Sequence, residues 1–114
     1  MPLVDVRYSD DVSDDELRRL AQLLPDLIAE AVDCPEEPWT GPAGPGDIEV
    51  RFRPRGDFDI GEFRYVIEIR TKLFASRLDD KQRRADVVRN GLSALGFGTV
   101  GVWLVLLDGA WSQT

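Results

Sequence analysis

The chain has 114 residues, which is enough for one domain and too few for two, so we expect a single domain over residues 1–114. Its net charge of −7 opposes binding to nucleic acids and anionic membranes, and because it shows neither a membrane-spanning apolar run nor a signal peptide, we expect a cytoplasmic protein. It contains one cysteine and no histidine, which excludes Ser-His-Asp and Cys-His catalysis and disfavours zinc and copper sites, so no metal or cofactor is expected.

The first half of the chain predicts a strand and a helix. Residues 2–8 alternate between apolar and polar positions, as in a half-buried strand. Ser13 and Glu16 then form a capping box, and apolar residues recur at helical spacing to about Val32. Pro25 lies inside this run, and we expect it to kink the helix or to remove one of its hydrogen bonds.

The remainder of the chain predicts three more strands and a second helix. The last strand is apolar on both faces, as expected of a strand that is covered on both sides. The expected segments are a Gly- and Pro-rich loop over 34–46, a strand over 48–53, a loop over 54–62, a strand over 65–73, a helix opened by Asp79 and Asp80 and stopped by Gly96, and a strand over 99–107.

The two halves of the chain resemble each other. Asp14-Asp15 and Arg18-Arg19 recur as Asp79-Asp80 and Arg83-Arg84, at an offset of 65 residues. Together with the β-α-β-β-α-β order, this repeat predicts an α/β (α+β) domain of two pseudo-symmetric βαβ units. These units would form a four-stranded sheet with two helices on one face. A ferredoxin-like domain has the same element order and is an alternative.

Pro2 suggests a function. Methionine aminopeptidase is expected to expose it by removing Met1, which would leave a secondary amine at the start of the first strand. An α-amino group titrates near about pH 8, and burial disfavours its protonated form. Such an amine can serve as a general base near neutral pH without histidine.

Four segments of the chain carry a family resemblance. They are Pro2-Leu3-Val4, Leu23-Leu24-Pro25-Asp26-Leu27-Ile28-Ala29, Ala75-Ser76-Arg77 before Asp79-Asp80-Lys81-Gln82, and Val102-Trp103-Leu104-Val105. Through them the chain resembles the tautomerase superfamily, whose members begin with such a proline and are built from βαβ units. The resemblance covers nearly the whole chain and favours the branch that includes macrophage migration inhibitory factor and 5-carboxymethyl-2-hydroxymuconate isomerase. It implies a homotrimer with active sites near the subunit interfaces.

The resemblance implies a cofactor-free isomerase that acts on a small enol or 2-oxo acid carrying a carboxylate. Pro2 would be the base, and Arg77 stands where relatives bind the substrate carboxylate, a task that suits a guanidinium. Further candidates for substrate binding are Arg70, Trp111 and Arg53. Arg53 alternates with Arg51 and Arg55 at a spacing of two residues, so the three could lie on one face of a strand. Ion pairing or packing is the alternative role for these candidates.

Two other functions stay open at this point. A decarboxylase or dehalogenase would use protonated Pro2 as an acid. The tyrosine that some dehalogenases of the superfamily carry falls near Val105 here, which argues against hydration chemistry. A non-catalytic trimeric or ferredoxin-like binding module needs no free amine, and retention of Met1 would favour it because the Pro2 nitrogen would then be an amide.

Overall fold

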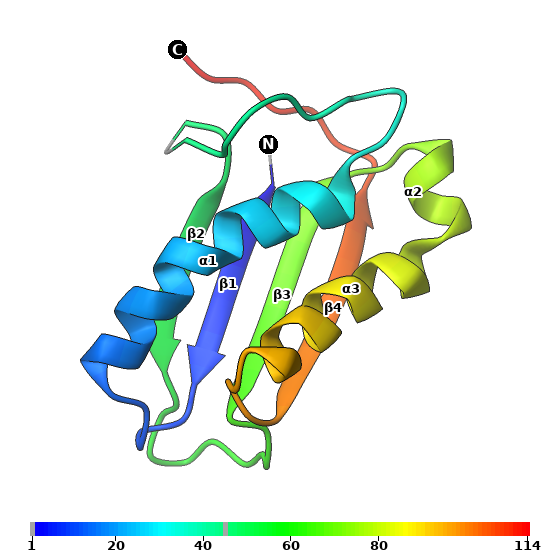
Figure 1. The fold of residues 1–114 in the computed structure, drawn as a ribbon. Coiled ribbons are helices and arrows are strands. Elements are labelled where there is room, and N and C mark those ends of the chain that lie inside the picture. Colours follow the sequence, from blue (N-terminus) through cyan, green and yellow to red (C-terminus); the bar gives the residue numbers. More distant parts are fainter. Residues whose placement is uncertain (1, 45) are drawn as a thin grey trace.

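The computed structural model describes residues 2–44 and 46–114, so Met1 and the loop residue Pro45 lie outside the described residues. The expected element order is confirmed, and all four strands form within one residue of the expected bounds (Figure 1). The elements are β1 (Leu3–Tyr8), α1 (Asp14–Val32), β2 (Glu49–Pro54), β3 (Tyr65–Lys72), α2 (Ala75–Asp79), α3 (Lys81–Ala94) and β4 (Val100–Leu107).

The sheet has the strand order β2-β1-β3-β4. Strand β1 pairs in parallel with β2, β3 pairs in parallel with β4, and the two central strands are antiparallel. The two strands of each βαβ unit are therefore direct neighbours. In a ferredoxin-like domain the βαβ units are split by an intervening strand, so that alternative is wrong.

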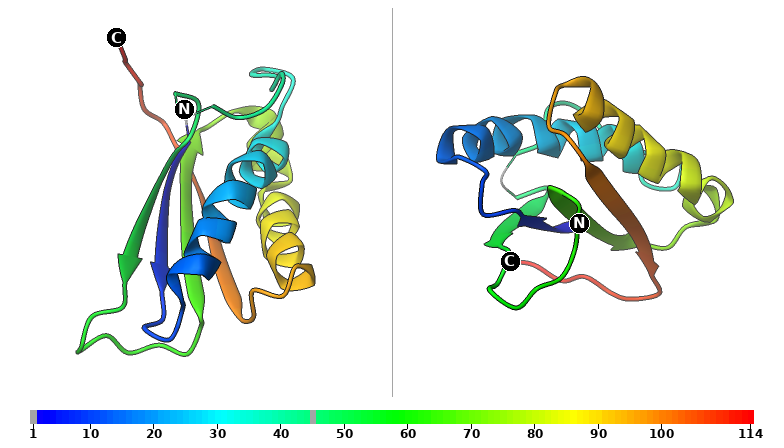
Figure 2. Two further views of the ribbon diagram at one scale, coloured as in Figure 1. Left: turned by 60° about the vertical axis from the view of Figure 1, so that its left-hand side comes forward. Right: turned by 90° about the horizontal axis from the view of Figure 1, so that it is seen from below.

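Both long helices cover one face of the sheet, whereas the β2–β3 loop (residues 55–64) and the C-terminal tail lie on the other side (Figure 2). We call this second side the open face. The core lies between the helices and the sheet because alternate strand residues point toward the helices. Its fully buried members include Val4, Val6, Leu20, Leu24, Ile28, Ile67, Ile69, Val88 and Leu92.

The ends of the helices follow the sequence signals in most respects. The Ser13 hydroxyl accepts from the Glu16 N–H (3.2 Å), and Gly96 follows α3 with a φ of +86°, as a glycine stop requires. Helix α1 continues through Pro25, because its apolar stripe is buried on both sides of the proline. Helix α2 was not expected, since its five residues are too few for a helical period. In the described part of the chain, no helix is long and apolar enough to cross a membrane.

Equivalent arginines of the two units donate hydrogen bonds to carbonyls at the C-terminal end of the other unit's helix. Arg19 of α1 donates to the Leu95 carbonyl at the end of α3 (2.7 Å). Its counterpart in the repeat, Arg84 of α3, donates to the carbonyls of Ala31 (3.0 Å) and Asp33 (2.6 Å) at the end of α1. A helix end leaves such carbonyls unpaired and favours cations. The surface ion pairs repeat in the same way, Arg18 with Asp15 and Arg83 with Asp80.

The substitution Arg84→Met is expected to lower the free energy of unfolding by about 2 kcal/mol, because it leaves the carbonyls of Ala31 and Asp33 without their donor. Arg83→Met is the matched control. Arg83 contacts the same Asp80, but its side chain is 65% exposed, so we expect a change within about 0.5 kcal/mol. Urea unfolding followed by circular dichroism measures both, and equal losses would contradict the capping role.

Candidate functional site

Pro2 lies directly before β1, at one end of the two central strands. It is buried, and its carbonyl accepts a hydrogen bond from the N–H of Glu49, the first residue of β2 (3.2 Å). A proline has no N–H to give to the sheet, so the first position of a strand suits it. The backbone of Pro2 is thus held at a defined place in the fold.

Thr71 of β3 lies beside Pro2. The β1–β3 register pairs Leu3 with Arg70, and one further step along both strands places Thr71 opposite Pro2. Thr71 is 2% exposed, and its hydroxyl is buried without a hydrogen-bond partner in residues 2–44 and 46–114. A buried hydroxyl without a partner is destabilising, so this position points to a use other than packing.

The sequence analysis did not identify Thr71, although the sequence carries a signal for it. Strand β3 sends Tyr65, Ile67, Ile69 and Thr71 to the core in strict alternation, and all four are buried. Thr71 is thus a polar residue at the last core position of an otherwise apolar series. A polar residue at such a position requires either a partner or a function.

Arg77 is placed at the same end of the sheet, but it faces the interior. Its side chain is 1% exposed, and its Nε donates to the Val32 carbonyl at the end of α1 (2.8 Å). One Nη donates to the Lys72 carbonyl at the end of β3 (3.0 Å), and the other contacts the Glu37 carboxylate (3.3 Å). In this conformation Arg77 holds three segments together around the Pro2 end of the sheet.

Arg70 and Arg53 lie on the open face, at different distances from Pro2. Arg70 is the register partner of Leu3 and forms ion pairs with Asp5 (2.7 Å) and Glu68 (2.9 Å). Arg53 is the register partner of Arg7, five residues along β1 from Pro2. At about 3.3 Å per residue, that is about 17 Å away. The single chain therefore brings Arg70 near Pro2 and leaves Arg53 at the other end of the sheet.

Trp111 belongs to the C-terminal tail, which leaves the sheet at the same end as Pro2 (Figure 1). The Leu73 N–H donates to the Leu107 carbonyl (2.9 Å), where the tail begins. The Trp111 side chain is 51% exposed, and its indole N–H donates to the Gln113 side chain (2.6 Å) within the tail. The aromatic face of Trp111 is thus presented to the surroundings of the Pro2 end.

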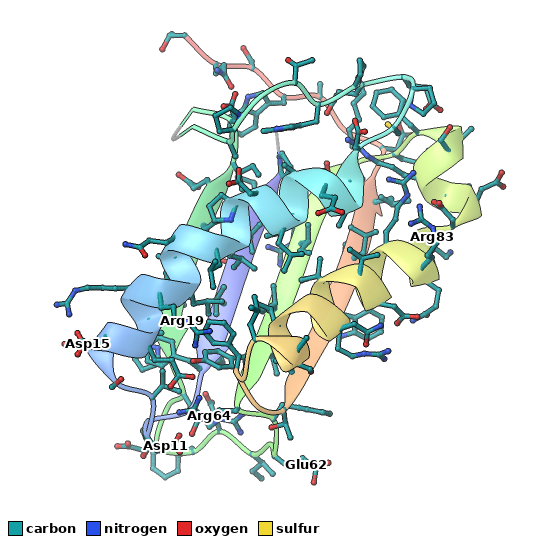
Figure 3. The ribbon with its side chains drawn as sticks, in the orientation of Figure 1. Asp11, Asp15, Arg19, Glu62, Arg64 and Arg83 are labelled. Carbon is teal, nitrogen blue, oxygen red and sulfur yellow. The ribbon has the colours of Figure 1, made fainter. Side chains whose placement is uncertain are left out.

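The opposite end of the sheet carries a structural ion-pair cluster. Figure 3 shows Arg19 between α1 and the end of α3, with Arg64 and Asp11 at this end of the molecule. Arg64 donates to both carboxylate oxygens of Glu16, and this hydrogen bonding lowers the pKa of Glu16. Burial is the main cause that raises the pKa of Tyr65 beside them, so its phenol stays protonated at neutral pH. Neither group is suited to act as a base there.

No protein-family model and no curated protein matches the sequence. Solved structures match nearly the whole fold. A macrophage migration inhibitory factor-like protein from Entamoeba histolytica has a TM-score of 0.62 at 12% identity, over 99% of this chain and 95% of that one. A fused 4-OT symmetric trimer has a TM-score of 0.59 at 14% identity, over 92% and 85%. A 5-carboxymethyl-2-hydroxymuconate isomerase from Deinococcus radiodurans R1 has a TM-score of 0.57 at 16% identity, over 98% and 88%.

A malonate semialdehyde decarboxylase shares the same architecture. All of these proteins are members of the tautomerase superfamily. The identities are low, so the likeness concerns the fold, and it agrees with the direct pairing of β1 with β2 and of β3 with β4. The resemblance expected from the sequence is thereby confirmed for the architecture, and this chain has the fold of the tautomerase superfamily.

Proposed function

We propose that this chain is a cofactor-free tautomerase or isomerase in which Pro2, exposed by removal of Met1, acts as the general base. The substrate is a small enol or 2-oxo acid that carries a carboxylate. The observation that carries the proposal is the buried proline at the start of a central strand, in a fold shared with an isomerase. The absence of histidine from the sequence leaves this amine as the group best suited to acid–base work near neutral pH.

The reaction is a proton transfer that balances without a cofactor. The lone pair of the Pro2 nitrogen takes a proton from the carbon next to the substrate carbonyl. The electron pair of the broken C–H bond forms a C=C bond, and the carbonyl oxygen takes up the negative charge of the enolate. The resulting ammonium then returns the proton to another carbon or to oxygen. An α-amino group titrates near about pH 8, so part of the Pro2 amine is in the neutral form that the first step requires near neutral pH.

The Thr71 hydroxyl has the chemistry to support both states of the amine. A hydroxyl donates one hydrogen bond and accepts others. It can therefore donate to the neutral nitrogen of Pro2 before the transfer and accept from the ammonium afterwards. We assign Thr71 this positioning role because the register places it opposite Pro2 and its hydroxyl has no other partner in the described residues.

The substrate carboxylate needs a cation near Pro2. Arg70 is the expected binding residue that the register places nearest, although its ion pairs with Asp5 and Glu68 would have to loosen. Arg77 contributes by holding the end of β3, including the Lys72 carbonyl, in place. Trp111 is available to a neighbouring copy of the chain, since its tail is exposed at this end.

The proposed active protein is a homotrimer, like the fused 4-OT symmetric trimer that shares its fold. The open face supports assembly because Trp103 of β4 is 70% exposed on it. Trp103→Glu is expected to give a smaller species in light scattering, since a charge cannot be buried cheaply at an interface. Leu78→Glu, at an exposed position of α2, is the control and should leave the trimer intact. A wild-type monomer would contradict the proposed assembly.

The base is tested first at the N-terminus. We expect the intact mass of the purified protein to lack Met1 and the Pro2→Ala variant to lose at least about a hundredfold in kcat/KM on phenylpyruvate-type substrates, since general bases contribute factors of about 10² to 10⁴. Circular dichroism should show a folded variant, and unchanged activity would overturn the mechanism. Retention of Met1 would leave an amide nitrogen and favour the non-catalytic binding module.

Thr71 is tested by separating stability from activity. Thr71→Val keeps the shape of the side chain and removes an unpartnered buried hydroxyl, so we expect the free energy of unfolding to stay equal or rise by about 1 kcal/mol. The same variant should lose about tenfold in kcat, with a shifted pH–rate profile. Thr71→Ser retains the hydroxyl and should keep most of the wild-type kcat and a wild-type pH–rate profile. A Thr71→Val variant with wild-type kcat and pH profile would remove Thr71 from the site.

Decarboxylation of a small acid is the second candidate, because a malonate semialdehyde decarboxylase has the same fold. That reaction would use Pro2 in its protonated form. The pH dependence of kcat/KM separates the two: it rises with pH through the pKa of a base and falls with pH through the pKa of an acid.

A further inference from the structure

The open face contains a hollow of about 920 Å³ that extends from Arg70, the register partner of Leu3, to the β2–β3 loop at the other end of the sheet. We call it the arginine hollow, because five arginines from three strands and the loop line it in a protein whose net charge is −7. These arginines are Arg7, Arg51, Arg53, Arg55 and Arg70.

Arg53 lies among three of these arginines. Arg51 stands two residues before Arg53 on the same face of β2, about 6.6 Å away, and Arg55 stands two residues after it, at the start of the β2–β3 loop. Arg7 is its register partner on the neighbouring strand, about 4.8 Å away. Like charges at such positions repel one another and are destabilising. Arg53 therefore adds an exposed positive charge beside these arginines, and a bound anion would offset it.

The other arginines of the hollow already have partners. Arg51 contacts Asp5 (3.3 Å) and Glu49 (3.7 Å), and Arg7 contacts Asp59 (3.1 Å). Arg53 makes no ion pair or side-chain hydrogen bond in the part of the chain that the structure describes. Of the four carboxylates that line the hollow, Asp5, Asp59 and Glu68 pair with neighbours of Arg53, whereas Glu62 forms no ion pair in the described residues.

The β2–β3 loop holds the arginines around Arg53 in place. Arg55 donates to the Phe63 carbonyl (2.7 Å), and a Cβ at Gly61 would lie 2.6 Å from its guanidinium, so a larger residue there would displace the end of the Arg55 side chain. Its Nε is buried without a hydrogen-bond partner in the described residues. Asp59 accepts from Arg7 and from the Gly56 N–H (2.7 Å). The hollow is therefore built by the loop and leaves donors of Arg53 and Arg55 unused.

We infer that the arginine hollow is a binding site for a small oxyanion, a carboxylate or phosphate group, with Arg53 as its principal ligand. A guanidinium presents two parallel N–H groups to such oxygens and gives short, charge-assisted hydrogen bonds. Arg53 lies about 17 Å from Pro2 along β1, whereas Arg70 lines the same hollow on its Pro2 side. Binding of an anion at Arg53 does not require the proposed reaction.

The experiment measures thermal unfolding of the full chain in increasing inorganic phosphate and, separately, succinate. Sodium chloride keeps the ionic strength constant, so general screening does not contribute. Wild-type protein should show a saturable rise in Tm with at least one of the two anions. A response to phosphate alone or to succinate alone identifies which oxyanion the site prefers.

Arg53→Gln removes the charge and keeps most of the side chain. We expect it to weaken the apparent affinity for the anion at least about tenfold, the loss of one charge-assisted interaction. Arg18→Gln is the matched control: Arg18 is an exposed arginine on α1 that lies away from the open face, and it should respond like the wild type. Equal anion responses in Arg53→Gln and wild type, or no response to either anion, would overturn the inference.

A second readout separates a ligand site from a structural arginine. In chloride alone, Arg53→Gln should have a Tm equal to or above that of the wild type, because it relieves repulsion among neighbouring arginines. A clear fall in Tm would mean that Arg53 has a partner within the protein, and this result would also overturn the inference.

Discussion

The fold depends on arginines that cross from one βαβ unit to the other. Helix α1 ends without a basic residue in its last turn, and its terminal carbonyls are instead served by Arg77 and Arg84 from the second unit. Arg19 of the first unit likewise donates a hydrogen bond to the carbonyl of Leu95 at the end of α3. Helix α3 is also capped within its own unit, because the N–H groups of Gly96 and Phe97 donate to the carbonyls of Ser93 and Leu92. The antiparallel β1–β3 pairing brings the two units together, and the arginines fix the helices relative to each other.

This exchange of caps also shapes the candidate site. Arg77 bonds the end of α1 and the end of β3 at the same time, so the segments around Pro2 are joined by one buried side chain. Pro2 and Thr71 then lie opposite each other on two strands whose register is set by the sheet. The proposed base and the residue proposed to position it are thus held by backbone pairing, with little dependence on flexible loops.

The sequence predicted the strands, both long helices and the internal repeat, because alternation, capping and turn residues are local signals. It did not predict α2, which has no capping side chain. Pro25 removes one hydrogen bond from α1 because it has no N–H, and the helix nevertheless continues because buried residues hold it on both sides. The candidate site was predicted less completely. Pro2 was identified from its position in the chain, whereas the burial of Arg77 and the partnerless hydroxyl of Thr71 depend on contacts between segments far apart in the sequence.

The pseudo-twofold arrangement has a consequence for the number of reactive amines. The two units share the crossing arginines Arg19 and Arg84 and their surface ion pairs, but the repeat aligns Ile67 with Pro2 of the first unit. Ile67 lies inside β3, so its nitrogen is an ordinary peptide nitrogen. Because the two units are joined in one chain, each chain has a single terminal amine. A trimer of such chains would have three terminal amines, whereas six separate units would have six. The connection that removes the second amine is the β2–β3 loop, and that same connection supplies Arg55 and Asp59 to the opposite end of the sheet.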